Sequence, residues 1–588
     1  MKKRWRVLST ENALAPEAFP SFHPIATTLL ANRGITDALD AEAFFHTDWE
    51  TGVHDPFLFS RMREAVARVF SAFENGERIT VHGDYDADGV TGSTAVITTL
   101  REIGSRFFVH GSPPTDTVDY YIPHRDKEGY GLRKETVGLL KERGTSLIIT
   151  VDCGIACVEE IALAKELGMD VIVLDHHRFG ETLPDAFNIH PGLPGETYPF
   201  KHLAAVGVSW KFCVALLTEA RSRGLEIPDG WDKWLLDLVS IATVTDMVPL
   251  VGENRVLLMY GLKVLNKTRR TGLKKLIETS GRTFGEINAR DIGFSIGPRI
   301  NAAGRMDHAS VALNLMLSES EEEADRLATD LETHNRNRQK TTEQMMVEAD
   351  ELLVASSKKQ EARDEARILV LWSENWAPAL VGLVAGRFLE RTGKPCVAFG
   401  KHGDTWIGSG RSPASYDITE AVKRAGDGLL TRAGGHIQAC GFSFTDDAHA
   451  PLFAERLRAD AHERLSDMDL TPELQIDTVI PLEDVTWSLV ETVERFQPFG
   501  VGNAAPVFLT RGLVVSEAMP IGNGGKHLRL LLRAPSGIFQ KFIGFGMGER
   551  LPEITAGSVV DVVYDVGVNE WNGRREIQCK IIDARASQ

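Results

Sequence analysis

The chain has 588 residues, a length that at roughly 150 residues per domain predicts about three or four domains. Its residues are 43% apolar and 25% charged, close to the average for globular proteins, which excludes disordered, collagen-like and coiled-coil classes. The net charge of −17 argues against a protein that coats nucleic acid indiscriminately, although it leaves room for a local basic channel.

The N-terminal segment and the cysteines indicate the compartment. The segment MKKRWRVLST reaches Glu11 without the apolar stretch of a signal peptide, and no run approaches the roughly 20 apolar residues of a spanning helix. The six cysteines include no CxxC pair and are too few for a disulfide framework in so long a chain. We therefore expect a cytoplasmic protein with no membrane association.

Residues 78–175 alternate short β-branched runs with helical stretches. Strands are predicted at ITVH (79–82), FFVH (107–110), LIITVD (147–152) and VIVLD (171–175), with helices near 91–100, 132–143 and 155–168. This alternation is typical of a mostly parallel sheet with helices on both faces. The polar clusters HGDYDADG, DCG and DHH follow three of the strands, at the carboxyl ends where such sheets bind ligands.

Two further segments precede the middle of the chain. The apolar helical run WLLDLVSIATVTD closes at Asp246, after which Met247, Val248 and Pro249 stop the helix. The segment DIGFSIGPRINAAGRMDH (291–308) is rich in glycine and predicts a loop.

The second half of the chain predicts a connector and two more folded regions. Residues 319–361 are strongly charged and have helical spacing, which indicates a long solvated helix between domains. A second α/β pattern follows, with strands ILVLW, PCVAF and TWIGSG, helices near 379–391 and 418–430, and the motif GGHIQACGFSF. From about Leu474 onward, short strands with Gly-rich turns and no helices between them favour a small barrel such as an OB-fold.

The polar clusters predict a metal centre. The stretch HGDYDADG places acceptor groups at every second position, and these carboxylates would repel one another strongly unless positive charge compensated them. An Asp-rich turn that caps a helix, or a pair of surface histidines in DHH, remains an alternative for either motif alone. Taken together, the clusters favour two divalent cations, Mn²⁺ or Mg²⁺, because the donor atoms are carboxylate oxygens and imidazole nitrogens. No cysteines have the spacing of a structural zinc site. The predicted metal-site residues are His82, Asp84, Asp86, Asp88, Asp152, Asp175, His176, His177 and Asp246.

HGDYDADG, VDCG, LDHH and ATVTD resemble the four motifs of the DHH phosphoesterase superfamily. GPRINAAGR and GGHIQACGF are similar to further signatures of its bacterial RecJ family, whose members are single-strand-specific 5′-to-3′ DNA exonucleases. The resemblance covers nearly the whole chain. It implies an α/β fold with four parts: an N-terminal region with the DHH phosphoesterase domain (1–318), a connector helix (319–363), a DHH-associated α/β domain (364–468) and an OB-like β-barrel (469–588).

The resemblance also implies how the ligands are shared. His82, Asp86 and Asp152 would hold one metal, and Asp88, Asp152, His176 and Asp246 the other, with Asp152 as the bridge. Asp84, Asp175 and His177 would then support the ligands or face the substrate. Asn301 and Arg305 resemble residues that face the scissile phosphate, where an arginine would neutralise developing charge. Arg299 is a neighbouring possibility, with an ordinary ion pair as its alternative.

The direction of degradation and the preference for single-stranded DNA require residues outside the metal centre. The resemblance implies a pocket for a terminal 5′-phosphate formed by Arg125, Ser409 and Arg411, because arginine forks and a hydroxyl suit a phosphate monoester. Ordinary structural arginines are the alternative. In GGHIQACGF, Gly434 and Gly435 let the backbone approach a sugar-phosphate chain beside His436.

The barrel mixes basic and aromatic residues, which suits single strands that stack their bases beside a positive groove. The residues predicted to bind DNA there are Lys526, Arg529, Lys541 and Trp571. Phe542 and Phe545 have opposite parity, so at least one of them faces the core.

The sequence therefore predicts a Mn²⁺- or Mg²⁺-dependent exonuclease that degrades single-stranded DNA from the 5′ end and releases 5′-mononucleotides. Two alternatives remain: a DHH phosphodiesterase that acts on short oligonucleotides or nucleotide phosphates, and a non-catalytic scaffold that binds single-stranded DNA. The resemblance also implies a partnership with single-stranded-DNA-binding protein and roles in recombination and mismatch repair. We expect a monomer.

Overall fold

The computed structural model describes residues 3–9, 13–15, 17, 19, 21–107, 117–356, 366–571 and 573–587. The chain divides into two compact units. The first is formed mainly by His54–Asp246 and Tyr260–Pro472, and the second by Arg4–Val53, Met247–Met259 and Glu473–Gln588. The division into four parts remains a prediction.

A parallel sheet forms the centre of the N-terminal half of the first unit. Its strand order is β3-β2-β4-β5-β6, and every neighbouring pair is parallel. The strands are β2 (Arg78–Gly83), β3 (Val118–Tyr121), β4 (Thr145–Val151), β5 (Asp170–Leu174) and β6 (Phe187–Ile189). This confirms the predicted α/β fold and the three strands that precede the polar clusters. The predicted strand at 107–110 is not formed at Phe107, which ends a helix, and residues 108–110 lie outside the described part of the chain.

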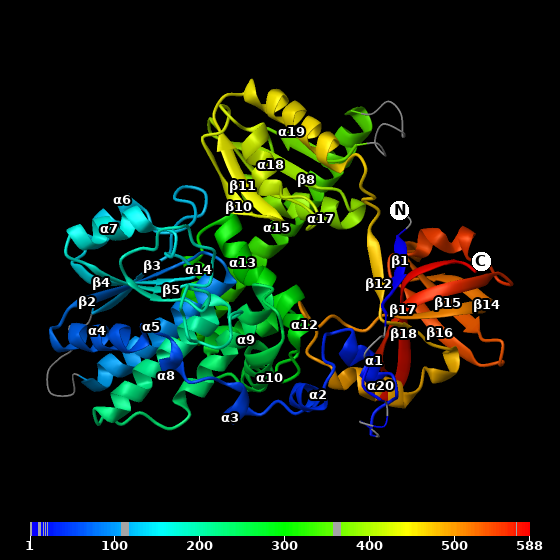
Figure 1. Cartoon of the computed structure of the whole chain (residues 1–588), viewed down its shortest axis with the longest axis horizontal. Helices are drawn as coiled ribbons and strands as arrows, with labels where there is room; N and C mark the ends of the chain where they lie inside the picture. Colours follow the sequence, from blue (N-terminus) through cyan, green and yellow to red (C-terminus); the bar gives the residue numbers. More distant parts are fainter. Residues whose placement is uncertain are drawn as a thin grey trace. The chain divides into compact units, whose positions relative to one another are not determined.

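Helices cover both faces of this sheet (Figure 1). One face carries α6 (Lys134–Glu142) and α7 (Val158–Glu166), and the other carries α4 (Met62–Glu74), α5 (Ala87–Phe107) and α8 (Ala205–Ser222). Ile148, Val171 and Val173 form one apolar core with α6 and α7. Because strand side chains alternate between faces, the residues between them point to the opposite helices. There, α5 comes so close that a Cβ on Gly92 would lie 2.8 Å from Val151 Cγ1.

More helices continue the first unit: η2 (Pro56–Leu58), η3 (Trp231–Leu235), α9 (Leu236–Thr245), α11 (Thr271–Thr279), α12 (Ala289–Asp291), the π-helix η4 (Ile292–Ile296), α13 (Gly297–Met306) and α14 (Ser310–Leu317). The loop predicted for residues 291–308 is therefore wrong, because most of this segment is helical. Its glycines serve close packing. A Cβ on Gly297 would lie 2.2 Å from Thr245 Cγ2, and one on Gly304 would lie 2.7 Å from the Tyr85 carbonyl oxygen. Composition alone cannot separate such contacts from turns.

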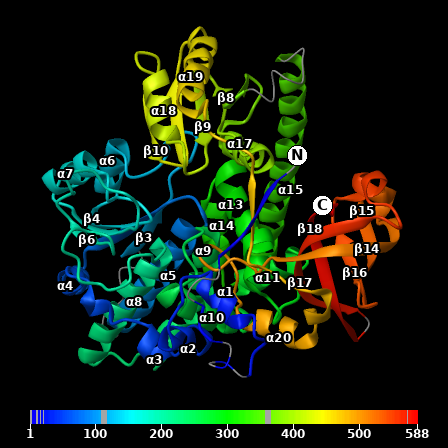
Figure 2. The same ribbon diagram turned by 45° about the vertical axis from the view of Figure 1, so that its right-hand side comes forward.

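The predicted connector is a single long helix, α15 (Glu321–Ser356). It packs against α11, α13 and α14 and then against α17 (Pro378–Thr392) and β7 (Leu369–Ser373), so it joins the two α/β regions of the first unit (Figure 2). Residues 357–363 of the predicted connector lie outside the described part of the chain.

The second α/β region has the strand order β10-β11-β9-β8-β7, in which only β7 and β8 are parallel. Its remaining strands are β8 (Cys396–His402), β9 (Thr405–Arg411), β10 (Arg432–His436) and β11 (Ala439–Phe444). The helices α18 (Ile418–Ala425) and α19 (His449–Leu465) share one apolar core with the sheet.

The second unit contains the predicted barrel. The strands β14 (Phe508–Ile521), β15 (His527–Arg533), β16 (Phe539–Gly544), β18 (Arg574–Ala586) and β17 (Val559–Trp571) pair in that order, and β17 pairs again with β14 to close the barrel. The short strands of this unit are β1 (Arg4–Val7), β12 (Glu473–Ile476) and β13 (Thr478–Val479), and β1 pairs with β12 in parallel. Its helices are α1 (Ala26–Ala31), α2 (Ala38–Phe45), α3 (Trp49–Gly52), η5 (Leu482–Asp484), α20 (Trp487–Arg495), η6 (Asn523–Gly525) and η7 (Gly548–Glu553), while α10 (Gly252–Leu265) begins here and ends in the first unit.

The core of the second unit combines residues from both ends of the chain. Leu29, Leu30 and Phe44 lie in one apolar cluster with Leu489, Phe496 and the inward-facing residues of the barrel. The side chain of Arg255 joins the same assembly, because it donates hydrogen bonds to the carbonyl oxygens of Phe44, Phe496 and Gln497.

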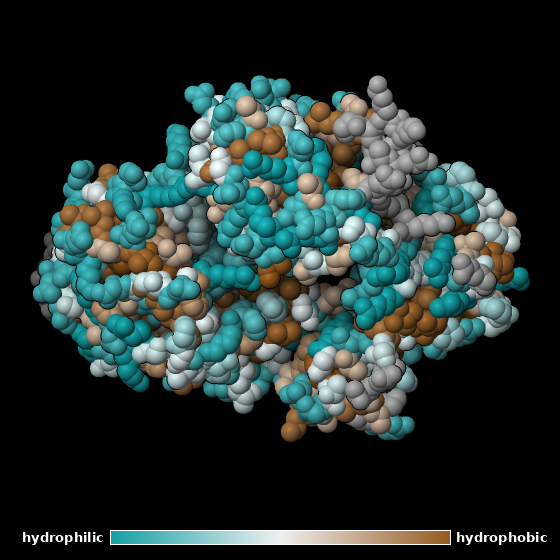
Figure 3. Space-filling view, turned by 45° about the horizontal axis from the view of Figure 1, so that its top comes forward, coloured by the Kyte–Doolittle hydropathy of each residue, from teal (hydrophilic) through white to brown (hydrophobic). Residues whose placement is uncertain are grey.

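One face of the molecule is largely polar. Figure 3 shows hydrophilic residues over most of the visible face, with apolar residues in small separate patches. Among the described residues, no helix is both long and apolar enough to cross a membrane.

Candidate metal centre

The polar clusters meet at one edge of the parallel sheet. Strands β2, β4 and β5 are neighbours, so their carboxyl ends bring together residues 84–88, Asp152 and the Asp175–His177 segment. Asp246 arrives from a different direction, as the residue that follows α9. The structure thus gathers the predicted metal-site residues that the sequence scatters over more than 160 positions.

His176 lies at the centre of this group. Its Nε2 is 3.4 Å from Asp152 Oδ1, 3.5 Å from Asp246 Oδ2 and 3.8 Å from Asp88 Oδ2. Three sets of donor atoms lie close enough to share a cation: Asp152 with His176 and His177, Asp88 with His176 and Asp246, and Asp84 with Asp86 and Asp152. Asp152 and His176 each belong to two of these sets, and the bridging role of Asp152 stays a prediction.

Several donor atoms of the cluster are buried without a hydrogen-bond partner. These atoms are His82 Nε2, Asp84 Oδ1, Asp152 Oδ1 and His176 Nε2. Buried polar atoms in folded proteins nearly always have a partner. Their common location therefore indicates that a ligand other than protein completes the site.

Burial and mutual repulsion shift the pKa values strongly. Burial, together with the charge of Asp86, raises the pKa of Asp88 to about 7, and burial with the charges of Asp88 and Asp86 raises that of Asp246 to about 9. Burial and four neighbouring carboxylates hold the pKa of Asp152 well above its usual range. Burial lowers the pKa of His82 and of His176 to about 4, so both imidazoles are neutral at pH 7 and free to act as metal ligands.

Asp175 and His177 form an ion pair beside the cluster. Burial opposes the charge on His177, but the hydrogen bond and the charge of Asp175 outweigh it and raise the His177 pKa to about 9. The same contact holds the pKa of Asp175 at about 2 despite its burial. Asp175 also accepts hydrogen bonds from the backbone N–H groups of Ile155, His176 and His177, so it fixes the loop that carries both histidines.

Asp152 has an unusual backbone conformation. Its φ is 62°, in the left-handed region that residues with a side chain rarely adopt. The Asp152 N–H donates to the Leu174 carbonyl at 2.9 Å, and its own carbonyl accepts from the Tyr130 hydroxyl at 3.0 Å. Tyr130 Oη also lies 3.0 Å from His177 Nδ1. The place of Tyr130 at this site could not be predicted from the sequence. Tyr130 lies in the loop between β3 and α6, follows no periodic pattern and belongs to no polar cluster.

Two helices begin at the cluster. Asp86 accepts from the N–H groups of Asp88 and Gly89 at the start of α5, and Asn301 accepts from Ala87 N at 2.7 Å. Asp88 accepts from Ala205 N and Val206 N at 2.8 and 2.7 Å, at the N-terminus of α8. Because a helix N-terminus carries partial positive charge, these contacts hold carboxylates together that would otherwise repel one another.

Three arginines gather beside the carboxylates. Burial and the charges of Arg125 and Arg338 lower the pKa of Arg305 to about 9, and Arg411 also contributes to this shift. Burial lowers the pKa of Arg411 as well, with a contribution from Arg125. Arg125 stacks over the Tyr85 ring at 4.7 Å, and Arg411 donates to Ser409 Oγ at 2.6 Å. Guanidinium groups that repel one another in a buried place form a suitable site for an anion.

The other predicted residues have varied surroundings. Arg299 is paired with Glu332 at 2.7 Å and donates to the Ser295 carbonyl, which is the ion-pair alternative named above. His436 lies on β10 within electrostatic range of Arg178 and His177. A Cβ on Gly435 would lie 2.3 Å from the Ala439 carbonyl oxygen, so glycine is required there by the pairing of β10 with β11.

In the barrel, Arg529 and Lys541 lie at outward positions of β15 and β16, between buried residues such as Leu528, Leu530 and Phe542. Lys526 is exposed just before β15. Phe542 is buried in the core and Phe545 is 57% exposed, which confirms that one of the two faces inward. The side chain of Trp571 is not among those that the structure describes.

The chain matches three protein families in the order expected: the DHH family N-terminal domain at residues 78–243, the DHHA1 domain at 365–463 and the RecJ OB domain at 476–583. It is 37% identical to the single-stranded-DNA-specific exonuclease RecJ of Bacillus subtilis, over 100% of this chain and 71% of that protein. It is 32% identical to the Escherichia coli protein of the same name, over 97% of both. The crystal structure of Thermus thermophilus RecJ with Mn²⁺ superposes with a TM-score of 0.81 at 30% identity, over 100% of this chain and 80% of that one. The Mg²⁺ complex gives 0.76 at 28% identity, over 100% and 79%.

The parallel sheet, the clustered donors at its edge and these similarities define a divalent-metal-dependent phosphoesterase of the DHH class. Its hydrolytic chemistry uses Mn²⁺ or Mg²⁺, for which the orphaned oxygen and imidazole donors are suitable ligands. The chain belongs to the RecJ family of single-stranded-DNA-specific exonucleases.

Proposed function

We propose that this protein removes nucleotides from the 5′ end of single-stranded DNA and releases 5′-mononucleotides. The observation that carries the proposal is the group of arginines, Arg125, Arg305 and Arg411, beside the carboxylate cluster. A terminal phosphate carries more negative charge than an internal one and offers more oxygens to guanidinium forks. A strand anchored by that group presents its next phosphodiester to the metal centre, which makes hydrolysis exonucleolytic.

The residues of the centre have distinct tasks. His82, Asp86, Asp88, Asp152, His176 and Asp246 would hold the cations. When bound, two divalent cations supply Lewis-acid activation of water and neutralise charge on the reacting phosphate. Asp175 orients His177, which would offer a hydrogen bond to the phosphate. Arg305 adds a buried cation at the same place, and its Nη1 is fixed by the Ala379 carbonyl at 2.8 Å.

Residues of the second α/β region and residues of the barrel would also contact the strand. Gly434, Gly435 and His436 on β10 would contact the sugar-phosphate chain, and Ser409 supports Arg411. Lys526, Arg529 and Lys541 on the barrel would also bind single-stranded DNA. Both relatives are single-stranded-DNA-specific exonucleases, which supports this substrate for the chain. We further propose that it works as a cytoplasmic monomer in DNA repair and recombination, together with single-stranded-DNA-binding protein.

End-labelled oligonucleotides test polarity and end recognition in one assay. The substrates are one sequence with a label at either end, with and without a 5′-phosphate, and with or without a complementary strand. We expect a 5′ label to appear at once in mononucleotides, whereas a 3′ label shortens progressively. A 5′-hydroxyl and a paired strand should each slow the reaction, and Arg411→Gln should remove the advantage of the 5′-phosphate.

Release of the 3′ label before the 5′ label would contradict the proposed 5′-to-3′ polarity. If dinucleotides were hydrolysed faster than long strands at equal concentration, the alternative of a short-oligonucleotide phosphodiesterase would be correct.

A further inference from the structure

A second pocket lies in the first unit away from the metal centre. Its volume is about 470 Å³, within the range of pockets that bind small molecules. It is lined by α5, by η3 and the start of α9, by the start of α11, and by the turn between α14 and α15. Thr98 lies ten residues beyond Asp88 on α5, so the pocket is roughly 15 Å along that helix from the metal ligands.

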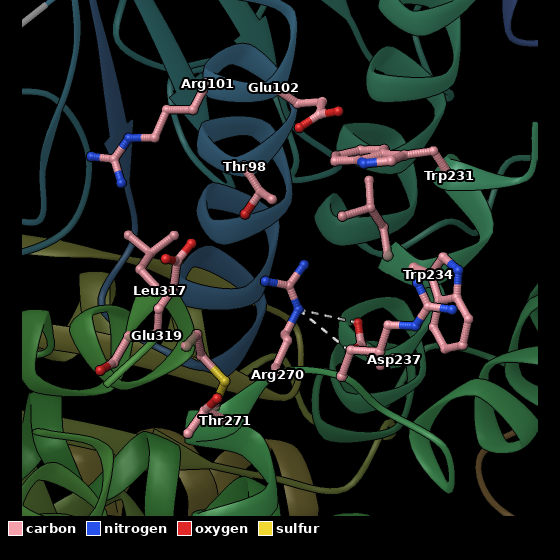
Figure 4. A pocket seen from close by; sticks show the side chains of 14 residues that line it. Thr98, Arg101, Glu102, Trp231, Trp234, Asp237, Arg270, Thr271, Leu317 and Glu319 are labelled. Carbon is pink, nitrogen blue, oxygen red and sulfur yellow. Dashed lines mark hydrogen bonds and ion pairs between the residues drawn. The ribbon is translucent and has the colours of Figure 1, made fainter. Parts of the chain in front are cut away.

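Two tryptophans form one side of this pocket. Figure 4 shows the indoles of Trp231 and Trp234 on the same side, with Arg270 extending between them and Thr98. Indole faces at a partly open cavity bind flat aromatic groups by stacking, and a nucleobase is the commonest flat group in a cell that also carries an anion. The guanidinium of Arg269 stacks on Trp234 at 3.8 Å, which leaves Trp231 as the open indole.

The pocket is lined by three arginines and three carboxylates, and two of the carboxylates already have cationic partners. Asp237 is buried and already satisfied by the Thr268 hydroxyl at 2.6 Å and by Arg270 at 3.4 Å. Glu102 is paired with Arg106 at 2.6 Å. Within the described part of the chain, Arg101 has no hydrogen bond or ion pair, and Arg269 has only its contact with Trp234. Glu319 on the rim can accept hydrogen bonds from sugar hydroxyls or base amino groups.

We propose that this pocket binds a nucleoside monophosphate, with the base on Trp231 and the phosphate near Arg101 and Arg270. The site is separate from the metal centre and the arginine group, so the proposal goes beyond the hydrolytic function and does not depend on it. The 5′-mononucleotides released by the protein have the required chemistry, and so do free ribonucleotides.

Calorimetric titration of the full-length protein with 2′-deoxyadenosine 5′-monophosphate in EDTA tests the proposal. The titration is repeated in the double variant Asp152→Ala/Arg411→Gln, which disables the metal centre and the arginine group. Binding should survive in the double variant. Arg101→Gln and Trp231→Leu should each weaken it about tenfold, the loss expected for one charged or stacking contact. Arg326→Gln, which removes an exposed arginine of α15, is the matched control and should bind as the wild type does.

Adenosine 5′-monophosphate and a short oligodeoxynucleotide complete the series. Tighter binding of the deoxyribonucleotide would indicate that the pocket binds a product of DNA hydrolysis, and tighter binding of the ribonucleotide would indicate a free cellular nucleotide. Both results support a nucleotide site. Absence of binding at millimolar concentration would overturn the proposal, as would loss of binding in the double variant or unchanged binding in Arg101→Gln and Trp231→Leu. Binding of the oligodeoxynucleotide without either monophosphate would also overturn it, because the pocket would then be part of a strand path.

Discussion

Asp152 combines a strained backbone with membership of two of the three donor sets in the metal centre. A left-handed conformation at a residue with a side chain costs roughly 1 kcal/mol or more and persists only where surrounding contacts enforce it. The strand partner Leu174 and the hydroxyl of Tyr130 supply these contacts. We therefore expect the Tyr130 hydroxyl to affect catalysis indirectly, by holding the backbone that positions the Asp152 carboxylate.

Removal of that hydroxyl in Tyr130→Phe should lower the affinity for Mn²⁺ and reduce kcat about five- to tenfold, because one hydrogen bond near charged groups is lost. KM for a long strand should change little. Steady-state kinetics and a Mn²⁺ titration followed by electron paramagnetic resonance measure both effects. Tyr416→Phe removes a comparable hydroxyl contact, to Asp460 at 2.7 Å, and should leave both values unchanged. Equal effects in the two variants would contradict a specific role of Tyr130.

The pKa values of the metal-site residues predict how the stability of the metal-free protein depends on pH. The folded-state pKa values of Asp88, Asp246 and His177 are about 7, 9 and 9, above the unfolded values of 3.8, 3.8 and 6.5. Between pH 6.5 and 9 the folded state therefore binds more protons, so the free energy of unfolding falls as pH rises. His82 and His176 act in the opposite sense, because their pKa falls from 6.5 in the unfolded state to about 4 in the folded state. This contribution fades above pH 6.5, as the unfolded imidazoles lose their protons.

Thermal unfolding in EDTA should show a midpoint that declines from pH 6.5 to 9. Added Mn²⁺ should restore it, most strongly at high pH, because cations replace the protons on the carboxylates. Asp246→Asn should flatten the decline. A midpoint that rises with pH in EDTA would contradict the raised pKa values of Asp88 and Asp246.

The donors of the metal centre could be predicted from sequence because they are polar residues at strand ends, and parallel strands bring their carboxyl ends to one edge. Tyr130 and the contact of Asn301 with Ala87 could not, because both depend on loop geometry that no periodicity encodes.

Helix α13 shows how glycine determines the approach of one element to another. Its Gly304 faces the Tyr85 carbonyl, between two carboxylates of the centre, and its Gly297 faces Thr245 next to Asp246. The helix thus packs directly behind two groups of ligands. The glycines that suggested a loop in the sequence are the residues that allow this contact, whereas strands β3 and β6 escaped prediction because they are only four and three residues long.

Gly304→Ala should displace the segment that carries Asp84 and Asp86, because the new Cβ would lie 2.7 Å from a backbone oxygen. We expect a loss of about 1–3 kcal/mol in stability and at least a tenfold loss of activity. Gly138→Ala is the control, because Gly138 lies in α6 with no atom within 4 Å of its added Cβ. It should stabilise the protein by about 0.5–1 kcal/mol. Chemical denaturation and single-strand hydrolysis measure the two variants, and similar losses in both would contradict the packing argument.

Across the whole molecule, the two compact units do not follow chain order. Residues 4–53 belong with the C-terminal barrel, although some 420 residues lie between them in the sequence. Their apolar side chains share one core with α20 and the barrel. Local patterns predict many of the helices and strands, but they carry no information about which distant segment covers an apolar face.

A chain that ends at Pro472 should therefore aggregate, because Ile25, Leu29, Leu30 and Phe44 would lose the core that covers them. Size-exclusion chromatography of this truncation against the full chain measures the outcome. Co-expression of residues 473–588 as a separate chain should restore a soluble complex. A monodisperse truncated protein would contradict the shared core.

This interlaced arrangement has a consequence during synthesis. The N-terminal segment leaves the ribosome long before its partner, and at about 5–20 residues per second the delay is roughly 20–80 s. During that interval a nascent polypeptide exposes an amphipathic stretch that cannot complete its fold. We therefore expect chaperones to bind residues 4–53 during synthesis, and we expect the yield of folded protein to depend on translation speed.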